Sequence, residues 1–116
     1  MNLQLTIQKC GNSKYRFGIN TNDSKTIFGK RGISIKIFWT NNSSDFIETK
    51  TKCGPSNDNF TSKIRKKGYD LYDIKINNWI KENNYNIYDP GKPTKLLFKY
   101  NKIKKELIFI KKIDKT

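Results

Sequence analysis

Apolar and polar residues alternate at the start of the chain. Leu3, Leu5 and Ile7 are separated by Gln4 and Thr6, and this two-residue period is typical of a strand with one buried face. The segment 15–19 alternates in the same way after a polar turn. Two neighbouring strands joined by a short turn predict an antiparallel hairpin.

The same alternation returns further along the chain. It predicts four more strands, at residues 33–38, 45–52, 95–100 and 106–113. The polar stretches 20–32 and 53–59 are predicted as loops, the first interrupted by Ile27-Phe28. The segment 60–67 fits either a short strand or a basic turn of helix, which makes about seven strands in all.

One segment has helical rather than strand periodicity. Ile76, Trp79 and Ile80 follow one another at helical spacing, and Asp73 can cap a helix that runs from about Tyr72 to Asn84. Because the connections between the predicted strands are short, the sheet is expected to be mostly antiparallel. We therefore predict a mostly β (α+β) fold over residues 1–116. Its single domain is a barrel-like or strongly curved sheet with one or two short helices.

Charge narrows the function more than the strand pattern does. The chain has 24 Lys and Arg against 10 Asp and Glu, a formal net charge of +14, and only three Glu residues. A bias toward codons for Lys and Asn explains the cations but not the scarcity of acids. Because such an excess repels itself in a compact fold, it predicts a polyanionic partner. Duplex DNA is the expected partner, and an anionic membrane surface or an acidic protein is the alternative.

The basic residues gather in the predicted loops and at strand ends. Loops on a rigid sheet can enter a groove and reach phosphates. The predicted nucleic-acid contacts are Lys25, Lys30, Arg31, Lys50, Lys52, Asn57, Asn59, Lys63, Arg65, Lys66 and Lys67. Lys suits phosphate, whereas Arg31 and Arg65 can read guanine edges and Asn57 and Asn59 adenine edges. A further basic cluster consists of Lys102, Lys104, Lys105, Lys111 and Lys112.

Aromatic residues among cations suggest a second kind of binding. Tyr15 and Phe17 lie between Lys14 and Arg16, a pattern that suits bases of single-stranded nucleic acid or RNA stacking on an exposed sheet. The competing interpretation places both rings in the core, which needs them because only 34% of the residues are hydrophobic.

One short motif suggests catalysis. Glu48-Thr49-Lys50 matches the last part of the pattern of Mg²⁺-dependent nucleases, with Asp23 or Asp45 as the other carboxylate. The chain has no histidine, which excludes His-based catalysis and most zinc sites. We expect a binding protein rather than an enzyme, with no cofactor and no metal, and keep the small nuclease as an alternative.

The two cysteines and the N-terminal residues bear on location. No basic start followed by a long apolar stretch precedes Cys10 or Cys53, so reduced thiols in a cytoplasmic protein are expected. The longest apolar run is four residues, and a membrane span is therefore not expected.

From residue 33 onward the layout resembles a known family. A strand at 33–38 precedes a polar returning strand, a loop, Trp79-Ile80, Asn83-Asn84, Asp89-Pro90-Gly91 and the strand 96–98. This order is similar to the pseudobarrel DNA-binding domains of plant transcription factors of the B-three type and of some bacterial restriction enzymes, although Asp89-Pro90-Gly91 replaces that family's Gly-Asp step. The resemblance implies two loop arms that embrace the major groove, around residues 24–31 and 52–67.

Overall fold

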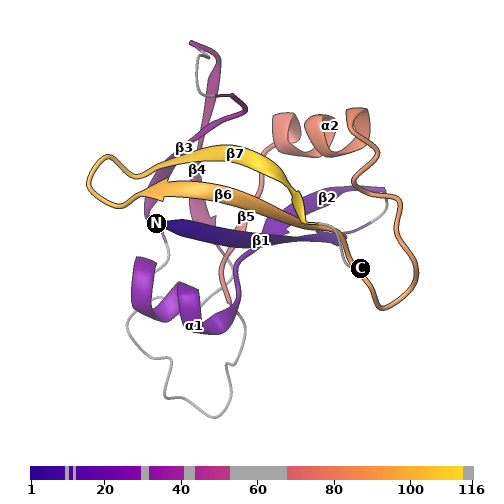
Figure 1. Ribbon diagram of the computed structural model, residues 1–116, viewed down its shortest axis with the longest axis horizontal. Coiled ribbons are helices and arrows are strands. Elements are labelled where there is room, and N and C mark those ends of the chain that lie inside the picture. Colours follow the sequence, from indigo (N-terminus) through magenta and orange to yellow (C-terminus); the bar gives the residue numbers. More distant parts are fainter. Residues whose placement is uncertain (10, 12, 30–31, 41–43, 53–67, 114–116) are drawn as a thin grey trace.

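Seven strands form a closed barrel in the computed structural model, which describes residues 1–116 except 10, 12, 30–31, 41–43, 53–67 and 114–116 (Figure 1). The strands are β1 (Asn2–Lys9), β2 (Tyr15–Gly18), β3 (Ser34–Phe38), β4 (Phe46–Lys52), β5 (Asp70–Leu71), β6 (Lys95–Asn101) and β7 (Glu106–Ile113). The helical segments are α1 (Thr21–Asp23), the π-helical η1 (Ser24–Phe28) and α2 (Ile74–Glu82). The predicted mostly β, barrel-like fold with few helices is confirmed.

The strand order around the barrel is β1-β2-β5-β4-β3-β7-β6, and β6 returns to β1. The predicted hairpin of the first two strands is present, with Ile7 opposite Phe17. Every pairing in the described barrel is antiparallel except that of β3 with β7, where Lys36 lies opposite Glu106 and Phe38 opposite Ile108. We call this β3–β7 pairing the parallel seam of the barrel.

Alternation along the strands fills the barrel interior. Leu3, Leu5, Ile7 and Phe17 are buried with a set of residues from the other strands and from α2. That set includes Ile35, Ile37, Leu71, Ile76, Ile80, Leu96, Phe98 and Leu107. The Phe17 ring meets the Phe98 ring edge to face at 5.4 Å, a favoured aromatic geometry. The interpretation of Phe17 as a core residue is therefore correct.

The helix predicted near residues 72–84 is α2. The carboxylate of Asp73 accepts a hydrogen bond from the Lys75 amide at 2.8 Å and so satisfies one of the free N–H groups that begin a helix. Ile76 and Ile80 face the core, and Trp79 stacks on Trp39 with ring centroids 4.3 Å apart. None of the helices described here is long and apolar enough to cross a bilayer.

One prediction about an individual element is wrong, and another cannot be compared with the structure. The segment 20–32 is not a simple loop, because α1 and η1 occupy residues 21–28. Buried contacts of Ser24 and Phe28 hold these turns against the barrel, whereas their polar sequence has little helix propensity of its own. The fifth described strand is Asp70–Leu71; the segment 60–67, expected to be strand or helix, lies outside the described residues.

Candidate nucleic-acid interface

Two basic connections leave the same end of the barrel. We call residues 24–31, between β2 and β3, the first arm, and residues 52–67, between β4 and β5, the second arm. The Gly32 amide donates to the Thr51 carbonyl at 2.8 Å, and the Thr51 amide donates to the Ile33 carbonyl at 3.0 Å. The residues that follow the first arm are therefore bonded directly to the residue that precedes the second.

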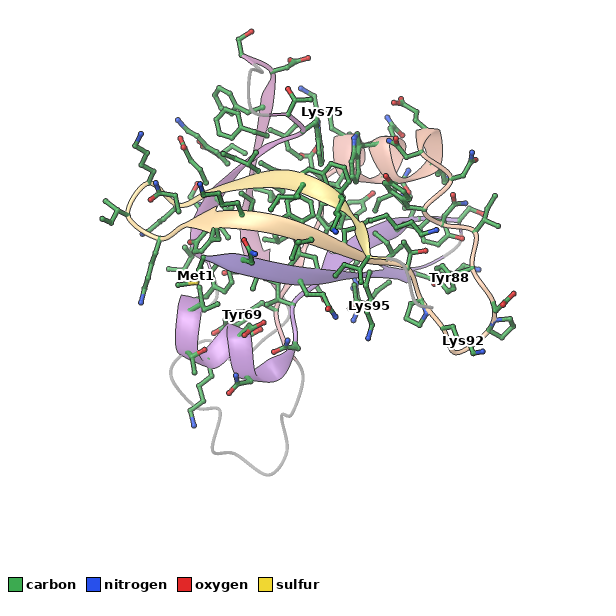
Figure 2. The ribbon with its side chains drawn as sticks, in the orientation of Figure 1. Met1, Tyr69, Lys75, Tyr88, Lys92 and Lys95 are labelled. Atoms are coloured by element: carbon green, nitrogen blue, oxygen red, sulfur yellow. The ribbon has the colours of Figure 1, made fainter. Side chains whose placement is uncertain are left out.

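Tyr69 joins the arms a second time. It is fully buried, and Figure 2 shows it between α1 and the barrel. Its amide donates to the Ser24 hydroxyl at 2.9 Å, and its phenol donates to the Gly29 carbonyl at 3.2 Å. A residue just beyond the second arm thus binds the first arm at two points five residues apart.

Ser24 is the pivot of this arrangement. Its side chain is buried, donates to the Asn20 carbonyl at 2.8 Å and accepts from the Tyr69 amide. Five residues later the Gly29 amide donates to the Ser24 carbonyl at 2.8 Å, which gives η1 its wide π-helical turn. Such turns are rare and occur often at functional sites.

Gly68 allows its own backbone to lie close to the backbone of Ile19 and Asn20. A Cβ at this position would overlap the Ile19 carbonyl oxygen and lie 2.9 Å from the Asn20 carbonyl carbon. The Ile19 amide in turn donates to the Tyr69 carbonyl at 2.8 Å. We call Ser24, Gly32, Ile33, Thr51 and Tyr69 the arm base, because they hold the start or end of both arms in one bonded unit.

Three of the predicted contact residues lie in the described part of the chain. Lys25 is exposed on η1, Lys50 is exposed on β4 opposite Ser34, and Lys52 is the last residue of β4. The remaining predicted contacts lie outside the described residues; they are Lys30, Arg31, Asn57, Asn59, Lys63, Arg65, Lys66 and Lys67. The structure brings the arm ends together and gives no position for most of the arm side chains.

Arg16 has a structural partner. Its guanidinium lies 3.2 Å from the Asp70 carboxylate, whose side chain is only 8% exposed. The pair joins β2 to β5 beside the register point where Gly18 faces Asp70. A cation that neutralises a buried acid is not free for phosphate, so Arg16 does not belong to the candidate interface.

The structure also bears on the stacking surface and the metal site considered from sequence. Phe17 is fully buried and Tyr15 packs against the core, so this strand offers no open stacking surface. Glu48 and Lys50 are exposed, and Glu48 lies opposite Lys36. No cluster of three metal-ligating side chains forms among the residues that the structure describes.

The β6–β7 hairpin carries more positive charge than the predicted list gave it. Residues 95–113 contain seven Lys and one Glu, whereas residues 73–82, around α2, contain two Lys and two acids. The basic cluster at residues 102–112 is visible in the sequence. It lies outside both arms.

The hairpin also approaches the first arm. The Phe28 ring of η1 lies 5.1 Å from the Tyr100 ring, centroid to centroid. Burial raises the pKa of the Tyr100 phenol above its ordinary value of 10.0, because the charged phenolate is poorly solvated there.

The chain matches no protein-family model, and no curated protein or solved structure is significantly similar to it.

Proposed function

We propose that this protein binds duplex DNA through the two basic arms and performs no chemistry on it. The observation that carries the proposal is the arm base. Two segments rich in Lys or Arg are separated by 20 residues in the sequence, and hydrogen bonds of the arm base join residues at or next to their ends. A rigid scaffold that presents two loops side by side is how many β proteins position binding residues.

The charge of the arms supports a phosphate polymer as the ligand. Residues 24–31 and 52–67 together contain eight Lys or Arg and one Asp. Lysine neutralises phosphate as a point charge, so binding is expected to depend mainly on the DNA backbone. Arg31 and Arg65 then supply contacts to base edges.

The proposal includes membership of the pseudobarrel class suggested by the sequence layout. A closed barrel with short helices between β2 and β3 and between β5 and β6 supports it. A cytoplasmic specificity module, associated with restriction or with regulation of a small genome, is the role that such a domain would serve.

The decisive experiment measures the affinity for a labelled duplex by fluorescence anisotropy over a salt series. If six phosphates are neutralised, affinity falls by about a thousandfold between 50 and 200 mM salt. Lys30→Glu, Arg31→Glu, Arg65→Glu and Lys66→Glu each weaken binding. An affinity that does not change with salt would contradict the proposal.

A matched control separates the arms from charge in general. Lys75 and Lys81 are exposed on α2, at the opposite end of the barrel from the arm base (Figure 1). Lys75→Glu/Lys81→Glu changes the net charge as much as Lys30→Glu/Arg31→Glu does. Equal weakening by the two double variants would show that the arms are not the interface. Incubation with plasmid and Mg²⁺ tests the nuclease alternative.

One observation favours single-stranded nucleic acid as a second candidate ligand. Phe46 is 42% exposed on β4, its ring lies 5.3 Å from that of Phe38, and the Lys36 ammonium lies 4.9 Å from the Phe46 ring centroid. Exposed rings beside cations can stack bases. If Phe46 stacks bases, Phe46→Ala lowers the affinity for single-stranded nucleic acid about tenfold and leaves the affinity for duplex DNA unchanged. Ile110 is another exposed apolar residue, and Ile110→Ala, the control, changes neither affinity.

A further inference from the structure

The turn between β6 and β7 is held in one shape by its own residues. The Asn101 side-chain oxygen accepts hydrogen bonds from the Ile103 amide at 3.1 Å and the Lys104 amide at 3.0 Å. Lys105 adopts φ 55°, the left-handed conformation that ends many tight turns. The backbone of this turn is therefore organised before any ligand arrives.

This turn lies at the same end of the barrel as the arm base. The Lys105 carbonyl accepts from the Lys36 amide at 3.0 Å, two residues after β3 begins. The N-terminal ammonium donates to the Tyr100 carbonyl at 3.2 Å, and Tyr100 packs on Phe28 of η1. Figure 1 shows the β6–β7 connection extending past the N-terminus of the chain, on the side where α1 lies.

The side chains at the tip of the turn are unusual in combination. Ile103 is 93% exposed, which is the largest exposed fraction among the large hydrophobic residues that the structure describes. The next is Ile87, which is 70% exposed. Lys102, Lys104 and Lys105 surround it and are all exposed. Within the described part of the chain, no carboxylate forms an ion pair with these three lysines.

A single exposed isoleucine is ordinary on a protein surface. Here it stands at the apex of a fixed turn, with unpaired cations on both sides. Apolar side chains that enter the minor groove of DNA separate neighbouring base pairs and bend the duplex, and cations beside them neutralise the flanking phosphates. The same side chains fit a membrane less well, because even a whole acyl chain gives only marginal anchoring and one isoleucine is far smaller.

We propose that the turn 102–105 is a third contact with duplex DNA, in which Ile103 enters the minor groove as a wedge and the three lysines bind the phosphates beside it. This inference rests on the proposed duplex binding, since the arms supply the affinity that positions the hairpin. It adds a deformation of the DNA that the arms alone do not require.

The test measures both the bend of the DNA and the affinity. A duplex labelled at both ends reports its end-to-end distance by energy transfer. Bound wild-type protein shortens that distance, and Ile103→Ala abolishes the shortening while lowering affinity less than tenfold. Ile87→Ala, which truncates an exposed isoleucine between α2 and β6, leaves both quantities unchanged.

The lysines have a separate readout. Lys102→Gln/Lys104→Gln lowers the slope of log affinity against log salt by about 1.8, since each lost phosphate contact contributes about 0.9. Lys75→Gln/Lys81→Gln on α2 leaves the slope unchanged. Urea unfolding of each variant checks that the exposed substitutions have not altered the fold.

The outcomes distinguish this inference from the proposed function. A wild-type protein that binds the duplex without bending it, with Ile103→Ala indistinguishable from Ile87→Ala, overturns the wedge and leaves the arms intact. A wild-type protein that does not bind the duplex overturns both. Binding to vesicles containing phosphatidylserine that is lost in Ile103→Ala, with no effect on DNA, overturns the wedge in favour of a membrane contact.

Discussion

Replacing Ser24 by alanine tests whether the arm base is a structural unit. The Ser24 hydroxyl is the acceptor for the Tyr69 amide, and both residues are fully buried. Ser24→Ala removes the hydroxyl that accepts from this buried amide. An unpaired buried donor costs about 1–3 kcal/mol. The lost donation to the Asn20 carbonyl adds little, because the Ser24 amide still donates to that oxygen at 2.9 Å.

The expected loss is therefore about 2 kcal/mol in the free energy of unfolding. With a urea dependence of about 2 kcal/mol per molar, the unfolding midpoint moves down by about 1 M. Fluorescence of the Trp39 and Trp79 stack, which packs on the core, follows the transition. The slope of the transition is expected to stay the same, because the substitution removes contacts and not compactness.

Ser34→Ala is the matched control, since Ser34 is exposed on β3 and its truncation is expected to change stability by less than about 0.5 kcal/mol. A Ser24→Ala midpoint equal to that of Ser34→Ala would refute the reasoning. It would mean that the Tyr69 amide finds another partner and that the two arms are not tied together through this hydroxyl.

Gly68→Ala is expected to lower the thermal unfolding temperature more than Gly91→Ala does. A Cβ at residue 68 would overlap backbone atoms, whereas a Cβ at residue 91 has no atom within 4 Å and the only penalty is the unfavourable φ of 77°. Equal losses would contradict the close approach at Gly68. Trp79→Ala is expected to cost about 3 kcal/mol in urea unfolding through the lost stack on Trp39, and a loss below about 1 kcal/mol would argue against that packing. Burial raises the pKa of the Tyr100 phenol. The contribution of the neutral phenol to the free energy of unfolding is therefore complete below about pH 10. It declines as the pH rises, because Tyr100 of the unfolded chain releases its proton first. Tyr100→Phe should accordingly lose less stability than wild type between about pH 9 and 11 in urea titrations, and parallel curves would rule this out.

The sequence was most informative where burial is one-sided. Leu3, Leu5 and Ile7 alternate because one face of β1 fills the barrel, and Asp73 marks the start of α2 because a capping carboxylate is a local signal. Both effects involve residues that are close together in the chain, so a pattern records them.

The missed elements depend on distant partners. The strand β5 has two residues, and its strand geometry comes from pairing with β2 and β4. The turns of α1 and η1 are held by Tyr69 and Tyr100, which lie far along the chain. No local pattern reports such contacts, and for this reason the arm base could not be read from the sequence.

The candidate site also has some features that the sequence predicts and others that depend on contacts between distant residues. The expectation of a polyanionic partner comes from net charge, which is a property of composition, and it stays a prediction. The cluster at residues 102–105 was visible as a run of lysines, but its relation to the first arm depends on the β3–β7 pairing and on the contact of Phe28 with Tyr100. Composition carries no information about which basic segments lie at one end of a barrel.

The parallel seam has a consequence for how the molecule is made. Strand β3 has β4 on one side, and among the described strands its neighbour on the other side is β7, the last of them in sequence. During synthesis the N–H and C=O groups on that side of β3 stay open until residues 106–108 leave the ribosome. An open strand edge is a template for pairing with another chain. Aggregation of the nascent protein is thus expected to be controlled by the interval between synthesis of β3 and synthesis of β7.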